Sequence, residues 1–495
     1  MRGDTGGMRN IADLLAAAAE RLPDATALID ITAGVSLTWP ELDAAVNGQA
    51  KALIGQGVQP GDRVVLRLPT SAEFVIALFA VARAGAIAVP VSPLSPRPEL
   101  TSVAERSEAR LVLSRDAEEG QPVATEPGEP LSSVGGDEDI AVVSFTSGTT
   151  GPVRGVMLSH RALLANVEQM AVVPDALREQ DRVFLSIPLC HIYGLGPGLL
   201  QSTYAGATVV LAERFEVAEA LEICAKHRIT VFGGVPAMYT DLADQPAEEL
   251  SAALATIRLL NSGAAPLHPK VLATIREKTG LGVFEGYGLT EAAPVVTTTL
   301  VTGYAKPGSV GRPLPGIELR LVGSDGGVVP IPLDPDDLDD TFDEDMAATG
   351  LVAIRGRNLF SGYWPDGTGG PDEDGWFRTG DVGYLDTDGD LHLVDRANDL
   401  IIVNGFNVFP HEVETVITEM PEVAEAAVIG MIDERSGEAV RAVVVPTSGA
   451  ALSQQQVVDY CAERLAGYKV PRTVEFADSL PHSPVGKVMR LRLRS

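Results

Sequence analysis

Helical and strand-like patterns alternate along almost the whole chain, and this alternation restricts the fold more than any other feature. The run FVIALFAVARAGAIAVPV (74–91) predicts a buried helix, a turn at glycine and a strand. The run VAEALEICAKHRITVFGGVP (217–236) repeats that order, and DRVVLRL and ARLVLS predict further strands. Strands separated by helices are typical of α/β proteins with largely parallel sheets, which is the fold class we expect.

Length and charge narrow the class of protein. With 495 residues the chain is too long for one average domain, and its 45% hydrophobic content predicts a large core. It carries 38 basic and 67 acidic residues, a net charge of −29. Such a charge disfavours binding to nucleic acid or to anionic membranes. Any polyanionic ligand must therefore meet locally concentrated Lys and Arg.

The cysteines and the hydropathy pattern suggest a reducing compartment. Cys190, Cys224 and Cys461 are odd in number and widely spaced, without a metal-binding pattern, so we interpret them as small buried hydrophobic residues. A cytoplasmic location is the simplest prediction. No apolar run reaches the roughly 20 residues that span a bilayer, so no integral membrane segment is expected.

Two changes in composition mark the organisation of the chain. The strongly acidic segment LDPDDLDDTFDEDMAATG (333–350) is interpreted as a solvated loop. The second change is a polar stretch at 395–399 between two apolar ones, followed by about a hundred residues with their own helix and strand pattern. We place a domain boundary there, which gives domains 1–395 and 396–495.

A glycine-rich run, SFTSGTTGPVRGVMLSH (144–160), is the first candidate for a binding site. A strand is expected before it at 140–143, and a helix after it with Ser159 as the N-cap. Such a loop between a strand and a helix can offer backbone N–H groups and hydroxyls to an anion. The Walker pattern is absent, so this is not the usual phosphate loop of nucleotide hydrolases.

Five further motifs follow in order: NSGAAPL (261–267), FEGYGLTEAAP (284–294), GWFRTGDVGYLDTDG (375–389), VDRANDLIIVNGFNVFPHEVE (394–414) and LPHSPVGKVMR (480–490). Together with the loop they closely resemble the acyl-adenylate-forming superfamily, which includes acyl-CoA synthetases, firefly luciferase and the adenylation domains of peptide synthetases. The resemblance extends from about residue 10 to the C-terminus. It implies a large N-terminal domain of α/β subdomains, a small mobile α/β C-terminal domain, and an active site between them.

The resemblance implies a reaction in two steps that uses ATP, Mg²⁺ and CoA. A carboxylate attacks the α-phosphate of ATP and expels pyrophosphate, and a thiol then attacks the acyl-adenylate and expels AMP. We therefore expect an AMP-forming acid–thiol ligase whose partners are a carboxylic acid, ATP and CoA. A homodimer is kept as one possible assembly.

Nucleotide contacts are implied for several motifs. They comprise Thr146, Ser147, Gly148, Thr149, Thr150, Gly151, Arg154, Gly263, Ala264, Ala265, Glu285, Gly286, Tyr287, Asp381 and Arg396. Tyr287 is expected against adenine, and Asp381 against both ribose hydroxyls, because a carboxylate offers two acceptor oxygens. The loop departs from the family pattern TSGTTGxPKG, since its Pro has moved one place and the Lys is Arg154. The guanidinium keeps the positive charge.

The implied catalytic groups are Thr290, Glu291, His191 and Lys487. Thr290 is expected to hydrogen-bond the α-phosphate, and Glu291 to coordinate Mg²⁺, a hard cation that prefers oxygen ligands. Lys487, in the position of the family's adenylation lysine, is expected to stabilise the charge that develops between carboxylate and α-phosphate. His191 is expected to lie near the carboxylate of the acid.

The predicted C-terminal domain carries the implied hinge and thiol site. The family usually has Asp or Lys at the hinge, where this chain has Asn398. Asn tolerates unusual backbone angles, so hinge function is retained in this interpretation. Gly405 and Phe406 are expected to line the channel for the pantetheine arm.

The acid is expected to be a fatty acid. His191 stands where amino-acid-activating relatives carry an Asp, and the acyl-pocket candidates His191, Gly233, Val235, Met238 and Gly288 include small and apolar residues. Malonate is disfavoured, because Thr240 and Asp241 stand where malonyl-CoA synthetases need an Arg. An enzyme that loads the acyl group onto a carrier-protein phosphopantetheine is the alternative, and a catalytically idle relative is a third hypothesis.

Overall fold

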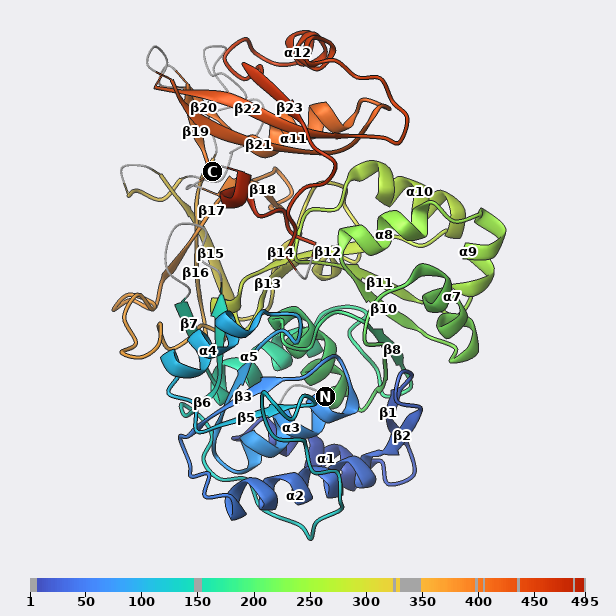
Figure 1. Ribbon diagram of the computed structural model, residues 1–495, viewed down its shortest axis with the longest axis vertical. Helices are drawn as coiled ribbons and strands as arrows, with labels where there is room; N and C mark the ends of the chain where they lie inside the picture. The colour runs from blue at the N-terminus through green and yellow to red at the C-terminus, as the bar shows by residue number, and fades with distance from the viewer. Residues whose placement is uncertain are drawn as a thin grey trace. The chain divides into compact units, whose positions relative to one another are not determined.

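The computed structural model describes residues 7–146, 154–323, 326–329, 349–396, 399–403, 406–433, 437–483 and 486–493 (Figure 1). The chain divides into two compact units. The first contains Met1–Gly148, Pro152–Leu319 and Ile354–Phe377, and the second contains Thr149–Gly151, Arg320–Ala353 and Arg378–Ser495. The predicted domain boundary at 395/396 stays a prediction.

Several predicted sites lie outside the described residues. They are Ser147, Gly148, Thr149, Thr150 and Gly151 of the glycine-rich loop, Asn398, Gly405, and residues 333–348 of the acidic segment.

Two sheets organise the first unit. The nine-stranded sheet has the order β14 (Arg312–Pro313), β13 (Val295–Thr298), β12 (Val283–Gly288), β11 (Leu259–Ser262), β10 (Val231–Gly234), β8 (Arg182–Leu185), β9 (Thr208–Leu211), β1 (Thr26–Asp30), β2 (Val35–Thr38). The five-stranded sheet has the order β5 (Leu111–Ser114), β3 (Arg63–Arg67), β4 (Ile87–Pro90), β6 (Ile140–Thr146), β7 (Arg154–Ser159). Neighbours from β1 to β12 in the first sheet, and from β5 to β6 in the second, pair in parallel. The predicted α/β class is confirmed.

Helices cover these sheets because their apolar residues recur on one face or all around. The helices of the first unit are α1 (Ala12–Arg21), α2 (Trp39–Gly55), α3 (Ala72–Arg83), α4 (Arg97–Arg106), α5 (His160–Ala171), α6 (Gln201–Ala205), α7 (Val217–Lys226), α8 (Pro236–Ala243), α9 (Ala247–Ala253) and α10 (Pro269–Thr279). Residues of α1, α2, α3 and α5 share one core with both sheets. Helices α7 to α10 form a second core with the nine-stranded sheet and lie beside β10 and β11 in Figure 1.

The predicted helix, turn and strand at 74–91 are present as α3 and β4. Every residue of α3 except Glu73 is buried, which explains a sequence that is apolar on almost all sides. Ser71 caps the helix by accepting a hydrogen bond from the N–H of Phe74. Gly85 has φ +74°, the left-handed conformation that glycine adopts at least cost.

The strand expected at 140–143 is confirmed as β6, but the prediction that the glycine-rich loop leads directly into a helix is wrong. Residues 154–159 form β7, which pairs antiparallel with β6 from Thr146↔Arg154 to Ile140↔Ser159. Val156, Met157 and Leu158 are buried there. The run is therefore more stable as a paired strand than as a loop. The helix starts after it, and Ser159 is its cap as predicted, accepting from the N–H of Ala162 at 3.2 Å.

The second unit is built mainly from antiparallel strands. A four-stranded sheet has the order β15 (Ile317–Val322), β16 (Gly350–Gly356), β17 (Phe377–Leu385), β18 (Leu391–Arg396), and residues 317–319, 354–356 and 377 of its strands are counted with the first unit. A five-stranded sheet has the order β20 (Phe406–Val408), β19 (Ile401–Val403), β22 (Gly437–Pro446), β21 (Val423–Asp433), with β23 (Thr473–Phe476) on β22. Helices α11 (Pro410–Thr418) and α12 (Gln454–Ala462) share its core. Among the described helices, none has both the length and the apolar character that a membrane span requires.

A buried ion pair joins α2 and α3, and it yields a stability prediction. Arg83, 2% exposed, donates to Asp43 and to Asn47 at 2.7 Å each. Arg83→Ala should lower the free energy of unfolding by about 3–5 kcal/mol, because Asp43 loses its cationic partner and keeps only the hydrogen bond from Asn47, at 3.0 Å. Urea denaturation would measure this loss. The control Arg178→Ala removes the exposed pair with Asp175, 2.9 Å apart, and should cost less than about 1 kcal/mol. Equal losses in the two variants would contradict this assignment.

Candidate active site

The carboxyl ends of three parallel strands supply the first part of the candidate site. In the register of β10, β11 and β12, Gly234 pairs with Ser262, and Ser262 pairs with Glu285. Because the strands are parallel, the motifs at 263–267 and 285–291 leave from one edge of the sheet (Figure 1). Ligands of open α/β sheets bind at this edge.

Tyr193, which the sequence analysis missed, lies across the end of β11. A Cβ placed on Gly263 would come within 3.1–3.4 Å of the Tyr193 ring, so any side chain there would require the ring to shift by a few tenths of an ångström. The Tyr193 hydroxyl donates long hydrogen bonds to the carbonyls of Gly234 and Asn261, at 3.4 and 3.5 Å. Burial raises the pKa of this phenol, which keeps it neutral. The sequence signal that could have identified Tyr193 is its position two residues after the predicted site residue His191.

The structure fixes the predicted His191 beside Tyr193. The Nδ1 atom of His191 accepts from the backbone N–H of Tyr193 at 3.2 Å, so a neutral ring carries its proton on Nε2. Val235 and Met238 are buried as acyl-pocket candidates should be. At Gly233 an added Cβ would meet nothing nearer than 4.0 Å.

Gly288 has a backbone role that the sequence analysis did not foresee. A Cβ there would lie 2.4 Å from the carbonyl oxygen of Pro294, because β12 and β13 approach closely. Any side chain at this position would force the strands apart. Its predicted contact with the acyl group stays a prediction.

Glu285 is a buried carboxylic group at the predicted adenine side of the site. It is 6% exposed, and its Oε2 atom accepts from the N–H of Leu267 at 3.1 Å. Its Oε1 atom has no hydrogen-bond partner among the described residues. Burial raises the pKa of Glu285 from 4.5 to about 7. Oε1 is thus a buried acceptor without a donor among the described residues. Tyr287, two residues on, is 8% exposed.

Thr290 and Glu291 lie in a short turn that a distant segment holds. The turn Thr290–Ala292 follows β12, and the carbonyl of Glu291 accepts from the N–H of Phe360 at 2.9 Å. The carbonyl of Ala292 accepts from the side chain of Asn358 at 2.7 Å. The segment 358–363 therefore fixes the backbone of this motif.

The same segment positions the Glu291 carboxylate. The Tyr363 hydroxyl donates to Glu291 Oε1 at 2.8 Å, and the Arg154 guanidinium lies 5.1 Å from the centre of the Tyr363 ring. Burial, followed by the charge of Glu291, raises the pKa of Tyr363, so the phenol stays a donor. Sequence analysis missed Tyr363. It lies in a Gly-Tyr-Trp run that is 72 residues from Glu291 in the sequence, and nothing else in the sequence marks it.

A magnesium ion fits the Glu291 carboxylate. Among the described residues, no cationic side chain forms an ion pair with it. Carboxylate oxygens are the ligands that Mg²⁺ prefers. Arg154 contacts the ring that holds Glu291 and not its carboxylate, which joins the glycine-rich loop to the predicted metal ligand through an aromatic side chain.

The other predicted groups belong to the second unit. Asp381 of β17 pairs with Arg396 of β18 across an antiparallel ladder, and Asp381 is 7% exposed. Lys487 closes a tight loop in which its N–H donates to Ser483 Oγ at 3.1 Å and its carbonyl accepts from the Ser483 N–H at 2.8 Å. Phe406 begins β20 and pairs with Val403. The structure thus brings Asp381 and Arg396 together.

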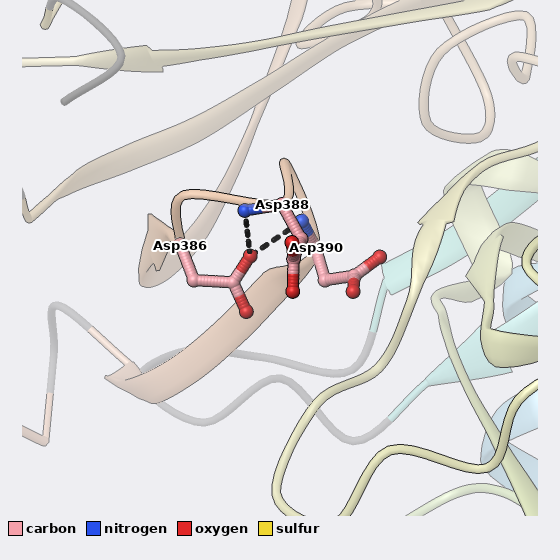
Figure 2. A group of neighbouring side chains, drawn as sticks. All are labelled: Asp386, Asp388 and Asp390. Carbon is pink, nitrogen blue, oxygen red and sulfur yellow. Dashed lines mark hydrogen bonds between the residues drawn. The ribbon is translucent and has the colours of Figure 1, made fainter. Parts of the chain in front are cut away.

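Three aspartates in the same unit form an acidic group (Figure 2). Their nearest carboxylate oxygens lie within 4.8 Å of one another. Asp386 Oδ1 accepts from the N–H groups of Asp388 and Asp390 at 3.0 Å each, and His392 Nε2 lies 2.7 Å from Asp386 Oδ2. These bonds close the β17–β18 hairpin, so the formation of the turn explains why the three aspartates lie together.

Comparison with known proteins shows the family and the fold of this chain. The model for AMP-binding enzymes matches residues 15–364, and that for the AMP-binding enzyme C-terminal domain matches 412–487. The chain is 36% identical over 480 residues to a feruloyl-CoA synthase from Amycolatopsis sp, covering 93% of this chain and 94% of that protein. It is 30% identical over 543 residues to the long-chain-fatty-acid–CoA ligase of Bacillus subtilis (strain 168), covering 98% and 94%. The ATP-bound structure of MatB from Rhodopseudomonas palustris superposes with TM-score 0.87 at 31% identity, covering 98% of each chain.

Loss of the Tyr363 hydroxyl should weaken magnesium binding. In Tyr363→Phe, Glu291 loses a hydrogen bond to a charged acceptor, so the Mg²⁺ concentration for half-maximal pyrophosphate exchange should rise about tenfold or more. Mn²⁺ binding followed by electron paramagnetic resonance should weaken in parallel. Tyr304→Phe, at a tyrosine that is 54% exposed, is the control. An unchanged metal dependence would show that Tyr363 does not position Glu291.

Glu285 should make stability depend on pH. Its pKa is raised from 4.5 to about 7, so its contribution is fully present below pH 4.5 and is lost as the pH rises through 7. The loss approaches about 3 kcal/mol. Glu285→Gln, which cannot ionise, should therefore gain stability relative to the natural chain between pH 5 and pH 8 in chemical denaturation. The exposed Glu249→Gln should not. A constant difference across this range would contradict the raised pKa.

Proposed function

Because this chain belongs to the family of AMP-binding enzymes and is an AMP-forming acyl-CoA ligase, we propose that the acid it activates is a fatty acid. The reaction class depends on the Thr290–Glu291 turn at the carboxyl edge of the nine-stranded sheet. The choice of acid depends on the neighbouring pocket residues. A place in fatty acid metabolism follows from this proposal.

The proposed first step forms an acyl-adenylate. A carboxylate oxygen of the acid attacks the α-phosphorus of ATP, and pyrophosphate leaves with the electrons of the broken P–O bond. Thr290 donates to an α-phosphate oxygen, and Lys487 stabilises the charge between carboxylate and phosphate. A magnesium ion bound at Glu291 would neutralise part of the triphosphate charge. In the second step the thiolate of CoA attacks the acyl carbon, and AMP leaves.

The observation that supports a fatty acid is the uncharged lining at the ends of β10 and β11. Val235 and Met238 are buried, Gly233 leaves space, and Tyr193 is neutral. Among these described residues there is no cation that would hold a second carboxylate. A monocarboxylic acid with an apolar tail therefore suits them, since burying that tail releases about 25 cal/mol per Å².

An aromatic acid is the second candidate. The ring of Tyr193 crosses the end of β11 and offers a flat apolar face to a planar acid. The relative from Amycolatopsis is a feruloyl-CoA synthase. Transfer to a carrier-protein phosphopantetheine, a homodimer and a cytoplasmic location stay predictions.

A panel of acids would test the substrate. It would run from acetate to long-chain fatty acids, with ferulate, coumarate and malonate, in the presence of ATP, Mg²⁺ and CoA. We expect thioester and AMP with aliphatic acids and none with malonate. Faster turnover of ferulate or coumarate would replace the fatty acid by an aromatic one. Pyrophosphate exchange without thioester would indicate a carrier protein as acceptor.

The variant Lys487→Ala would separate the two half-reactions. It should abolish pyrophosphate exchange and largely spare thioester formation from supplied acyl-adenylate, because the lysine acts while the adenylate forms. Equal loss of both half-reactions would remove Lys487 from this role.

A further inference from the structure

A basic pocket lies at the edge of the nine-stranded sheet opposite to the candidate active site. Its volume is about 620 Å³, and it is lined by Gln180, Arg182, Lys226, His227, Arg228, Thr230 and Thr256. Arg182 begins β8, residues 226–230 connect α7 to β10, and Thr256 precedes β11. These strands are parallel, so the pocket is at their amino ends, whereas residues 263–267 and 285–291 leave their carboxyl ends.

The lining of this pocket consists of hydrogen-bond donors. Every lining side chain has an N–H, O–H or ammonium group, and none of these residues is acidic. The hydroxyls of Thr230 and Thr256 already donate, to Asp181 Oδ1 at 2.8 Å and to the carbonyl of Ile229 at 2.7 Å, so a ligand would bind mainly to the nitrogen donors. The Nε atom of Arg182 donates to the carbonyl of His227 at 2.5 Å, which ties β8 to the segment 226–228. The cations therefore come from two different elements that are held together.

The positive charge of the pocket is not compensated. Among the described residues, neither Lys226 nor Arg228 forms an ion pair. Two other arginines of this region are paired: Arg258 lies 2.5 Å from Asp181, and Arg178 lies 2.9 Å from Asp175. Lys226 and Arg228 are both exposed, so their charges are accessible to an anion from solution.

The pKa of His227 reflects the same positive surroundings. Its pKa is lowered, first by burial and then by the charges of Lys226 and Arg182. No carboxylate contributes in the opposite direction. The lowered pKa agrees with the geometry.

Stabilisation of α7 explains only part of this arrangement. Cations at a helix C-terminus interact with its dipole by about 0.3–1 kcal/mol each, and α7 ends at Lys226. Arg182 belongs to β8 and lies outside this helix. Arg228 has φ +50°, a left-handed conformation in which glycine is the usual residue after a helix. A guanidinium group is present there at some cost to the backbone.

We propose that this pocket is a second anion site, separate from the nucleotide site, that binds a small phosphate-bearing anion such as a diphosphate group. Arg and Lys are the side chains that bind phosphate most strongly. The net charge of −29 repels extended anionic surfaces, which favours a small soluble anion over a membrane. The proposal depends only on residues of the first unit and not on the identity of the acid.

Protection of Lys226 would test the site directly in the full chain. Lysine acetylation by an activated ester, followed by mass spectrometry, would be measured with increasing inorganic pyrophosphate. Acetylation of Lys226 should slow by up to about tenfold at ten times the dissociation constant. Lys51, exposed on α2, should react at a constant rate. Equal rates at Lys226 with and without pyrophosphate would overturn the proposal.

A pair of charge-matched variants would complete the test. Lys226→Gln/Arg228→Gln should lose one pyrophosphate-binding event in calorimetry, while Lys51→Gln/Arg276→Gln, which removes two exposed cations elsewhere, should keep it. The same binding in both variants would contradict the site. Protection of Lys226 by vesicles containing phosphatidylglycerol, but not by pyrophosphate, would assign the pocket to a membrane surface and overturn the proposal for a soluble anion.

Discussion

The parallel register of β10, β11 and β12 is the constraint on which the candidate active site depends. It aligns Gly234, Ser262 and Glu285 in one row and sends the following loops out from the same edge. The close approach of β12 and β13 at Gly288 then fixes where the Thr290–Glu291 turn begins. Hydrogen bonds of the backbone thus place groups that lie far apart in the sequence, before any side chain contributes.

Local motifs allowed much of the fold and part of the site to be predicted from the sequence. The helix and strand at 74–91 were predictable because burial on all sides and a glycine turn are local signals. Asp381 and Arg396 were identified from their motifs, and their backbones pair across β17 and β18, while their roles stay predictions.

The parts that sequence analysis missed depend on contacts between distant segments. Tyr363 acts on Glu291 from 72 residues away, and nothing in the Gly-Tyr-Trp run identifies its partner. Strand β7 was missed because its pairing with β6 decides its conformation, and the glycine-rich loop next to it suggested a direct entry into the helix. Tyr193 was missed since its effect appears only where its ring meets Gly263.

The contact between Tyr193 and Gly263 has a consequence for how such a pocket changes. The ring fills the space that a Cβ at 263 would take, so the two positions share one volume. A larger residue at 263 is accommodated best when the residue at 193 is smaller, and such an exchange leaves the strands and their hydrogen bonds in place. The depth of the pocket can therefore be altered by two compensating substitutions, which makes substrate range in this fold a property of a residue pair.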